Sequence, residues 1–180
     1  MPFLETDRAV CDKLLPGLRA QLAELPLAEL EAESSPAIEI FRAHGGTNLL
    51  VPASYGGLDA SPVDACRVIR ALAAQAPSMT VATMMHHFSL GTLFAVAELL
   101  GDGSDLETIL LRRVVEERLL VASGFAEGRT QQGILSPTMM AEEVPGGYLV
   151  NGSKKPCSLS RSMDLLTASV GVPQPDGSVE

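Results

Sequence analysis

The chain has 180 residues, of which 46% are hydrophobic, and it carries a formal net charge of −9. This length fits one domain, or one domain with part of a second. The charge excludes nucleic acid as a partner, because a phosphate backbone needs a basic face. The three cysteines have no metal-like spacing and indicate reduced thiols in the cytoplasm.

The first third of the chain contains residues that typically start and end short helices. A helix is predicted from Thr6 to Glu24, interrupted at Pro16. The acidic stretch 29–33 predicts a solvated connection. Ser35 followed by Pro36 predicts the start of a short helix, which the glycine pair at 45–46 ends.

Two longer helices follow. Ser61 and Pro62 predict a capped start, and the apolar residues after them recur on one face: Ala65, Val68, Ile69 and Leu72. Residues 79–100 carry Glu98 as their one formal charge, yet they also hold two histidines and several hydroxyl groups, which argue against a membrane span. We expect this segment to be a buried core helix. A capping box at Ser104 and Glu107 predicts one more helix.

After residue 118 the hydrophobic pattern no longer has the helical period. It consists instead of short apolar runs, which predict strands. They cover residues 119–125, 134–144, 148–150 and 164–172, and the second and third pair across the turn at 145–147. The fold class is therefore α+β. An all-α domain over residues 1–118 precedes an incomplete antiparallel β domain over residues 119–180.

Two segments carry a family resemblance. Residues 51–57 read VPASYGG, and residues 146–155 read GGYLVNGSKK. Both resemble motifs of the acyl-CoA dehydrogenase superfamily, the "VPxxYGG" turn and the "GxYxxNGxK" hairpin, in the expected order. The resemblance covers the N-terminal helical domain and part of the middle β domain, with some features of the flavin monooxygenase branch, and the C-terminal helical domain is absent.

The resemblance implies a flavin site on two loops. The first holds Phe125, Ala126 and Glu127, with Ala126 in place of a family threonine that binds the flavin pyrimidine edge. Gln132 and Gly133 stand where the family has a Ser-Asp pair, and they are the predicted substrate-binding residues. FAD is the implied cofactor.

The second loop follows the hairpin motif as Pro156, Cys157 and Ser158. Ser158 falls where the family places a hydroxyl and a backbone N–H beside flavin N5. The Cys-Ser pair is similar to the "FCSG" version found in flavin monooxygenases of this fold. FMN would serve under that interpretation, with His86 or His87 as the candidate catalytic residue. Lys154 and Lys155 favour a solvated hairpin end over a phosphate contact.

Three functions stay open. The main interpretation is oxidation of the CH–CH bond of an acyl thioester, with flavin N5 as hydride acceptor. The family's catalytic base lies in the C-terminal domain, so we assign none, and we expect the chain alone to be inactive. A complete protein would be a homo-oligomer, or this chain would pair with a complementary C-terminal half. The alternatives are a two-component monooxygenase fed by a flavin reductase, and a truncated non-catalytic module that binds a partner through an exposed β edge.

Overall fold

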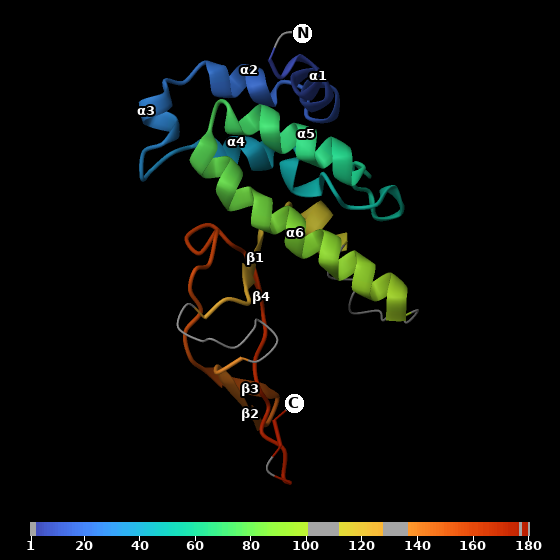
Figure 1. Ribbon diagram of the computed structural model, residues 1–180, viewed down its shortest axis with the longest axis vertical. Coiled ribbons are helices and arrows are strands. Elements are labelled where there is room, and N and C mark those ends of the chain that lie inside the picture. The colour runs from blue at the N-terminus through green and yellow to red at the C-terminus, as the bar shows by residue number, and fades with distance from the viewer. Residues whose placement is uncertain (1–2, 101–111, 128–136, 177, 180) are drawn as a thin grey trace.

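The computed structural model describes residues 3–100, 112–127, 137–176, 178 and 179. Helices occupy the N-terminal part and strands follow (Figure 1), so the predicted α+β class is confirmed. The labelled helices are α1 (Glu5–Leu14), α2 (Leu18–Ala23), α3 (Leu27–Leu30), α4 (Ala37–Ala43), α5 (Pro62–Ala73) and α6 (Pro77–Leu100), with single 3-10 turns η1 (Gly46–Asn48) and η2 (Ala53–Tyr55). Residues 112–116 are also helical. The strands are β1 (Val121–Gly124), β2 (Met140–Val144), β3 (Gly147–Asn151) and β4 (Leu165–Ala168).

The first predicted helix is divided as its proline requires. α1 ends at Leu14 and α2 begins at Leu18, because Pro16 cannot donate a backbone hydrogen bond and Gly17 adopts φ +82°. The acidic connection is only partly as predicted, since α3 forms one helical turn at its start. Pro26 precedes this turn in extended geometry, which is a favourable entry to a helix.

The predicted cap of α5 is present. The Ser61 hydroxyl accepts a hydrogen bond from the Asp64 N–H at 3.1 Å, and Pro62 occupies the first turn. Ala65, Val68 and Leu72 are buried, whereas Ile69 is half-buried. This face packs against α1 and α6 and forms the centre of the helical core.

The VPASYGG turn needs its two glycines for different reasons. Gly56 has φ +84°, a conformation that residues with a side chain rarely adopt. Gly57 lies so close to Val51 that an added Cβ would meet the Val51 carbonyl oxygen at 2.0 Å. The turn therefore folds back on Val51, and the Asp59 N–H donates to the same carbonyl at 2.9 Å.

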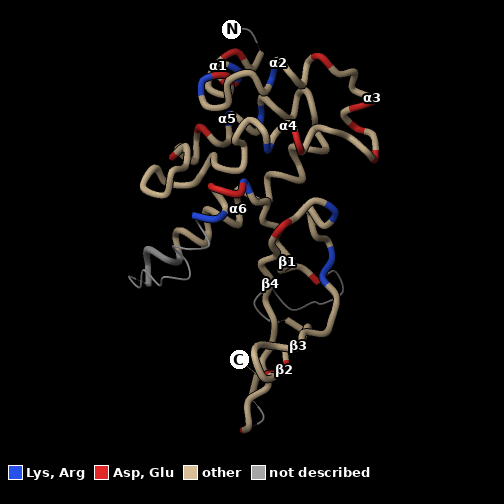
Figure 2. The backbone as a smooth tube through the Cα atoms, turned by 180° about the vertical axis from the view of Figure 1, so that it is seen from behind, with Lys and Arg blue, Asp and Glu red and all other residues tan. Residues whose placement is uncertain are grey.

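α6 runs as one long diagonal between the other helices and the strands (Figure 1), and it contacts both α5 and β1. It carries no charged residue from Pro77 to Ala97, and Figure 2 draws its tube in tan where charged segments do not overlap it in the view. The prediction of a fully buried helix is wrong, because Val81, Met84 and Phe88 are 60%, 42% and 59% exposed. These three share one face, so only the opposite face belongs to the core. None of the helices in the described part of the chain is long and apolar enough to cross a membrane.

The strands form two separate pairs. β2 and β3 make the predicted antiparallel hairpin, with Glu143 opposite Tyr148. β1 and β4 instead pair in parallel, with Val121 opposite Leu165, which corrects the expectation of purely antiparallel strands. The intervening chain, which includes the hairpin, is long enough to serve as the crossover that parallel strands require. The predicted capping box at Ser104 and Glu107 lies outside the described residues.

Candidate functional site

A cavity of about 220 Å³ lies between α6 and the two loops predicted to bind flavin. Its walls include Phe125 and Ala126 from the segment after β1, and Pro156 and Ser158 from the loop after β3. Four of the six predicted cofactor-binding residues are thus brought together from positions about 30 apart in the sequence.

Three further residues line the cavity and were not predicted. Met85 and Phe88 come from α6, and Ser123 comes from β1. The two α6 residues lie one helical turn apart, so their spacing is a signal that they share a face. Ser123 gives a clearer signal, because a hydroxyl group within a short, buried apolar strand requires a hydrogen-bond partner.

The remaining predicted residues lie elsewhere. Cys157 is half-buried against the main core, with its Sγ 3.8 Å from the Ser158 carbonyl oxygen. Glu127 does not line the cavity and makes the interactions described next. Gln132 and Gly133 lie outside the described residues, so their substrate-binding role stays a prediction.

A buried ion pair joins the two loops. The Lys154 Nζ lies 2.7 Å from Glu127 Oε1, and each side chain is only 5% exposed. Glu127 also accepts hydrogen bonds from the hydroxyl and the backbone N–H of Thr138 and from the backbone N–H of Met139. The Lys154 ammonium, with these other donors, lowers the pKa of Glu127 to about 2.

Lys154 is therefore not the solvated end of the hairpin that its position predicts. Its side chain returns to the first loop, whereas Lys155 is exposed as expected. The Lys155 backbone N–H also donates to the Ala126 carbonyl oxygen at 2.8 Å. Two bonds, one between side chains and one between backbones, thus fix the separation of the loops that line the cavity.

His86 connects the helices to the strands. Its Nδ1 accepts a hydrogen bond from the Val121 N–H at 3.0 Å, so its Nε2 carries the proton and donates to the Thr47 carbonyl oxygen at 2.8 Å. Burial lowers the pKa of His86 to about 4 and keeps the ring neutral. Both ring nitrogens are used in holding η1 and β1 to α6, which is a structural arrangement.

His87 is also buried, and its ring packs edge-on against Phe41 with centroids 5.8 Å apart. Burial, with a smaller contribution from His86, lowers the pKa of His87 to about 3. Its Nδ1 has no hydrogen-bond partner within the described part of the chain. Neither histidine is among the residues that line the cavity.

The cavity suits one part of a flat, largely apolar cofactor. Met85, Phe88, Phe125 and Pro156 offer apolar walls, and the hydroxyls of Ser123 and Ser158 offer donors and acceptors. Complete cofactor sites are typically about 300–1,000 Å³, so this smaller cavity would hold only a portion of the ring system. The residues present therefore fit the flavin that the sequence motifs imply.

Comparisons with known proteins test the predicted family resemblance. No protein-family model matches the chain. The chain is 54% identical over 177 residues to isobutylamine N-hydroxylase from Streptomyces viridifaciens, and the match covers 98% of this chain and 47% of that protein. The chain thus spans about half the length of this curated relative.

Two solved structures show the fold. FMN-bound TdsC from Paenibacillus sp. A11-2 matches with a TM-score of 0.68 at 23% identity, over 97% of this chain and 42% of that chain. Glutaryl-CoA dehydrogenase from Mycobacterium smegmatis matches with a TM-score of 0.68 at 15% identity, over 93% and 43%. The chain has the acyl-CoA dehydrogenase fold. The resemblance predicted from the turn and the hairpin is confirmed, and the chain spans about 42–43% of the length of these two structures.

Proposed function

We propose that the complete protein is a flavin-dependent monooxygenase that hydroxylates the nitrogen of a small alkyl amine. The observation that carries this proposal is the 54% identity to an isobutylamine N-hydroxylase across nearly the whole chain. The finer choice of reaction comes from that relative, because matches at 15–23% identity support the fold alone.

The cavity residues would hold the flavin ring. Ser158 would approach the ring with its hydroxyl and backbone N–H, and the backbone from Phe125 to Glu127 would offer polar groups to the pyrimidine edge. Met85 and Phe88 would exclude water from one side. Either FMN or FAD suits this part of the site, and FMN has the support of the TdsC structure.

The overall reaction balances with reduced flavin as the source of two electrons. The amine R–NH₂, one O₂ and two hydrogen equivalents give R–NHOH and one water. A flavin reductase would then be the partner that supplies reduced flavin. The three cysteines are free, which favours a reducing compartment such as the cytoplasm.

Oxidation of an acyl thioester is the weaker candidate. Its support is the likeness to glutaryl-CoA dehydrogenase, at 15% identity. Glu127 is a carboxylate within the first predicted flavin loop, yet it is bonded to Lys154, Thr138 and Met139. A base must reach a substrate proton within hydrogen-bond distance, which this arrangement does not offer.

The test uses the full-length protein with both substrate classes. Chemically reduced FMN, O₂ and isobutylamine should yield N-hydroxyisobutylamine, identified by mass spectrometry, in an amount that scales with protein. Glutaryl-CoA or a saturated acyl-CoA with an artificial electron acceptor should give no enoyl product. An enoyl product without any hydroxylamine would reverse the assignment.

A further inference from the structure

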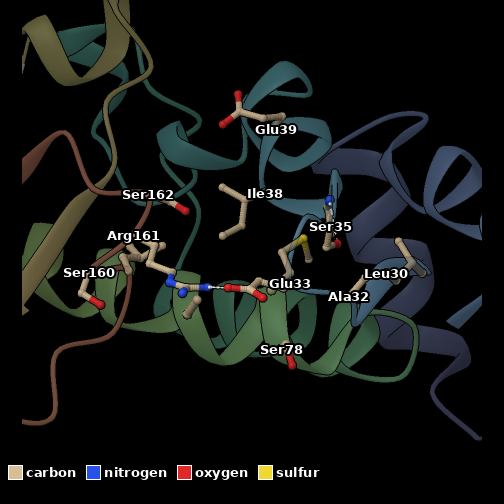
Figure 3. Close-up of a pocket in the computed structure, with 14 residues that line it drawn as sticks. Leu30, Ala32, Glu33, Ser35, Ile38, Glu39, Ser78, Ser160, Arg161 and Ser162 are labelled. Carbon is tan, nitrogen blue, oxygen red and sulfur yellow. Dashed lines mark hydrogen bonds and ion pairs between the residues drawn. The ribbon is translucent and has the colours of Figure 1, made fainter. Parts of the chain in front are cut away.

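A second hollow, the Glu33 groove, lies beside the N-terminal end of α6 (Figure 3). Its volume is about 320 Å³, and it is enclosed by the α3–α4 connection, the first turns of α6 and the chain at 159–162. Apolar residues form its floor, among them Leu30, Ile38 and Met79. Serine hydroxyls at 35, 78, 160 and 162 lie around them, so the groove has an apolar base and polar sides.

One ion pair spans the groove. Figure 3 shows Arg161 extending from the 159–162 segment to Glu33 on the α3–α4 connection, with Nη1 and Oε1 2.7 Å apart. Both side chains are more than three-quarters exposed, at 76% and 79%. An ion pair so exposed is held weakly, because water and salt screen it. Arg161 can therefore exchange for another cation at little cost.

The charges around the groove favour a cation. Glu33 and Glu39 both line it, whereas Arg161 is the one basic residue among the lining residues described. The Glu39 carboxylate lies 3.5 Å from the Arg42 guanidinium, and Arg42 is also paired with Asp164. Arg42 is thus shared between two carboxylates, and a negative charge remains for a ligand.

The groove leads toward the cavity. It shares Ser78 and Ala82 with an open hollow that also contacts Val81, and this hollow includes Ser158. Ser158 in turn lines the cavity proposed for the flavin ring. The three spaces therefore follow one side of α6 from Glu33 to Ser158.

We propose that the Glu33 groove is a recognition subsite for a small alkylammonium ion, which displaces Arg161 and pairs with Glu33 while its alkyl group lies on the apolar floor. This inference rests on the proposed function, since the alkyl amine that an N-hydroxylase takes is largely an alkylammonium cation at neutral pH. The subsite lies at the outer end of the path to Ser158.

The test measures binding of isobutylammonium chloride to the full-length protein by calorimetry, with FMN present. Glu33→Gln keeps the shape of the side chain and removes its charge, so the dissociation constant should rise about tenfold. Arg161→Gln removes the competing cation, so the dissociation constant should fall about threefold. Glu29→Gln, an exposed change outside the groove, is the matched control and should leave it unchanged.

A separate FMN titration keeps this inference distinct from the proposed function. Normal FMN affinity with no isobutylammonium binding, or with equal binding by the wild type and both groove variants, would overturn the subsite alone. Ammonium binding with opposite effects of the two variants supports the subsite, even if the protein binds no flavin. The effects of the two groove variants on isobutylammonium binding should disappear at high salt, because the contact with Glu33 is exposed.

Discussion

Replacing Lys154 with methionine should raise the flavin dissociation constant at least about tenfold. Methionine keeps most of the length of the side chain but leaves the buried Glu127 carboxylate without its cationic partner. The loop that carries Phe125 and Ala126 would then lose its link to the loop that carries Ser158, and the cavity walls would separate. Fluorescence titration with FMN measures the effect directly.

The control for this prediction is Lys155→Met. Lys155 is exposed and contributes a backbone N–H to Ala126, which the substitution retains. The flavin affinity of the Lys155→Met variant should match that of the wild type. Equal losses in both variants would show that positive charge near the hairpin matters, and the buried ion pair does not.

The ion pair between Glu127 and Lys154 stabilises the folded protein only while Glu127 is ionised. The pKa of Glu127 is lowered to about 2 in the folded protein, below the value of about 4.5 expected when unfolded. The stabilisation is therefore fully present above about pH 4.5 and is lost as the pH falls toward 2. Flavin affinity between pH 7 and 5 should show no contribution from this carboxyl group.

His86→Leu should lower the free energy of unfolding by about 2–5 kcal/mol at neutral pH. Leucine would leave the Val121 N–H in β1 and the Thr47 carbonyl in η1 buried without partners. His87→Leu is the matched control on the same helix. Its Nδ1 has no partner in the part of the chain described, so an apolar replacement should cost less than about 1 kcal/mol.

His86 also predicts the direction of the acid response. Its pKa is about 4 when folded and 6.5 when unfolded, so below pH 6.5 the unfolded chain binds the proton more readily. Stability should therefore be constant above about pH 6.5 and fall by about 3 kcal/mol between pH 6.5 and 4 from this residue alone. His87 acts in the same direction.

Urea unfolding at pH 7.5 and pH 5 tests both statements. The wild type should lose stability at the lower pH, and His86→Leu should lose less between the two pH values because one titrating group is gone. An equal pH dependence in wild type and His86→Leu would contradict the buried, neutral state assigned to His86.

Local features of the fold could be predicted from the sequence. The cap at Ser61 and the hairpin turn at 145–147 depend on residues a few positions apart, so both can be predicted from the local sequence. The parallel pairing of β1 with β4 could not be predicted in this way. It joins strands separated by a hairpin, and short apolar runs do not reveal their direction.

The loops that line the candidate site could be predicted from the sequence, whereas the roles of Lys154 and His86, which hold neighbouring segments in place, could not. Motif resemblance identified Ser158 and Phe125, which the structure places around one cavity. Lys154 was interpreted as solvated because a charged residue beside a hairpin is usually exposed, and only the tertiary contact with Glu127 shows otherwise. His86 was a candidate catalyst for a similar reason, since sequence does not show which hydrogen bonds occupy a histidine ring.

The central claim is that the cavity beside Ser158 binds a flavin ring, and a visible absorption titration with FMN and FAD tests it most directly. The wild type should bind one of them with a perturbed flavin band at near-stoichiometric amounts. Met85→Trp, which fills the cavity, should abolish that binding, while Met84→Trp, on the exposed side of the same helix turn, should retain it. Undiminished flavin binding by Met85→Trp, or none by the wild type, would contradict the account.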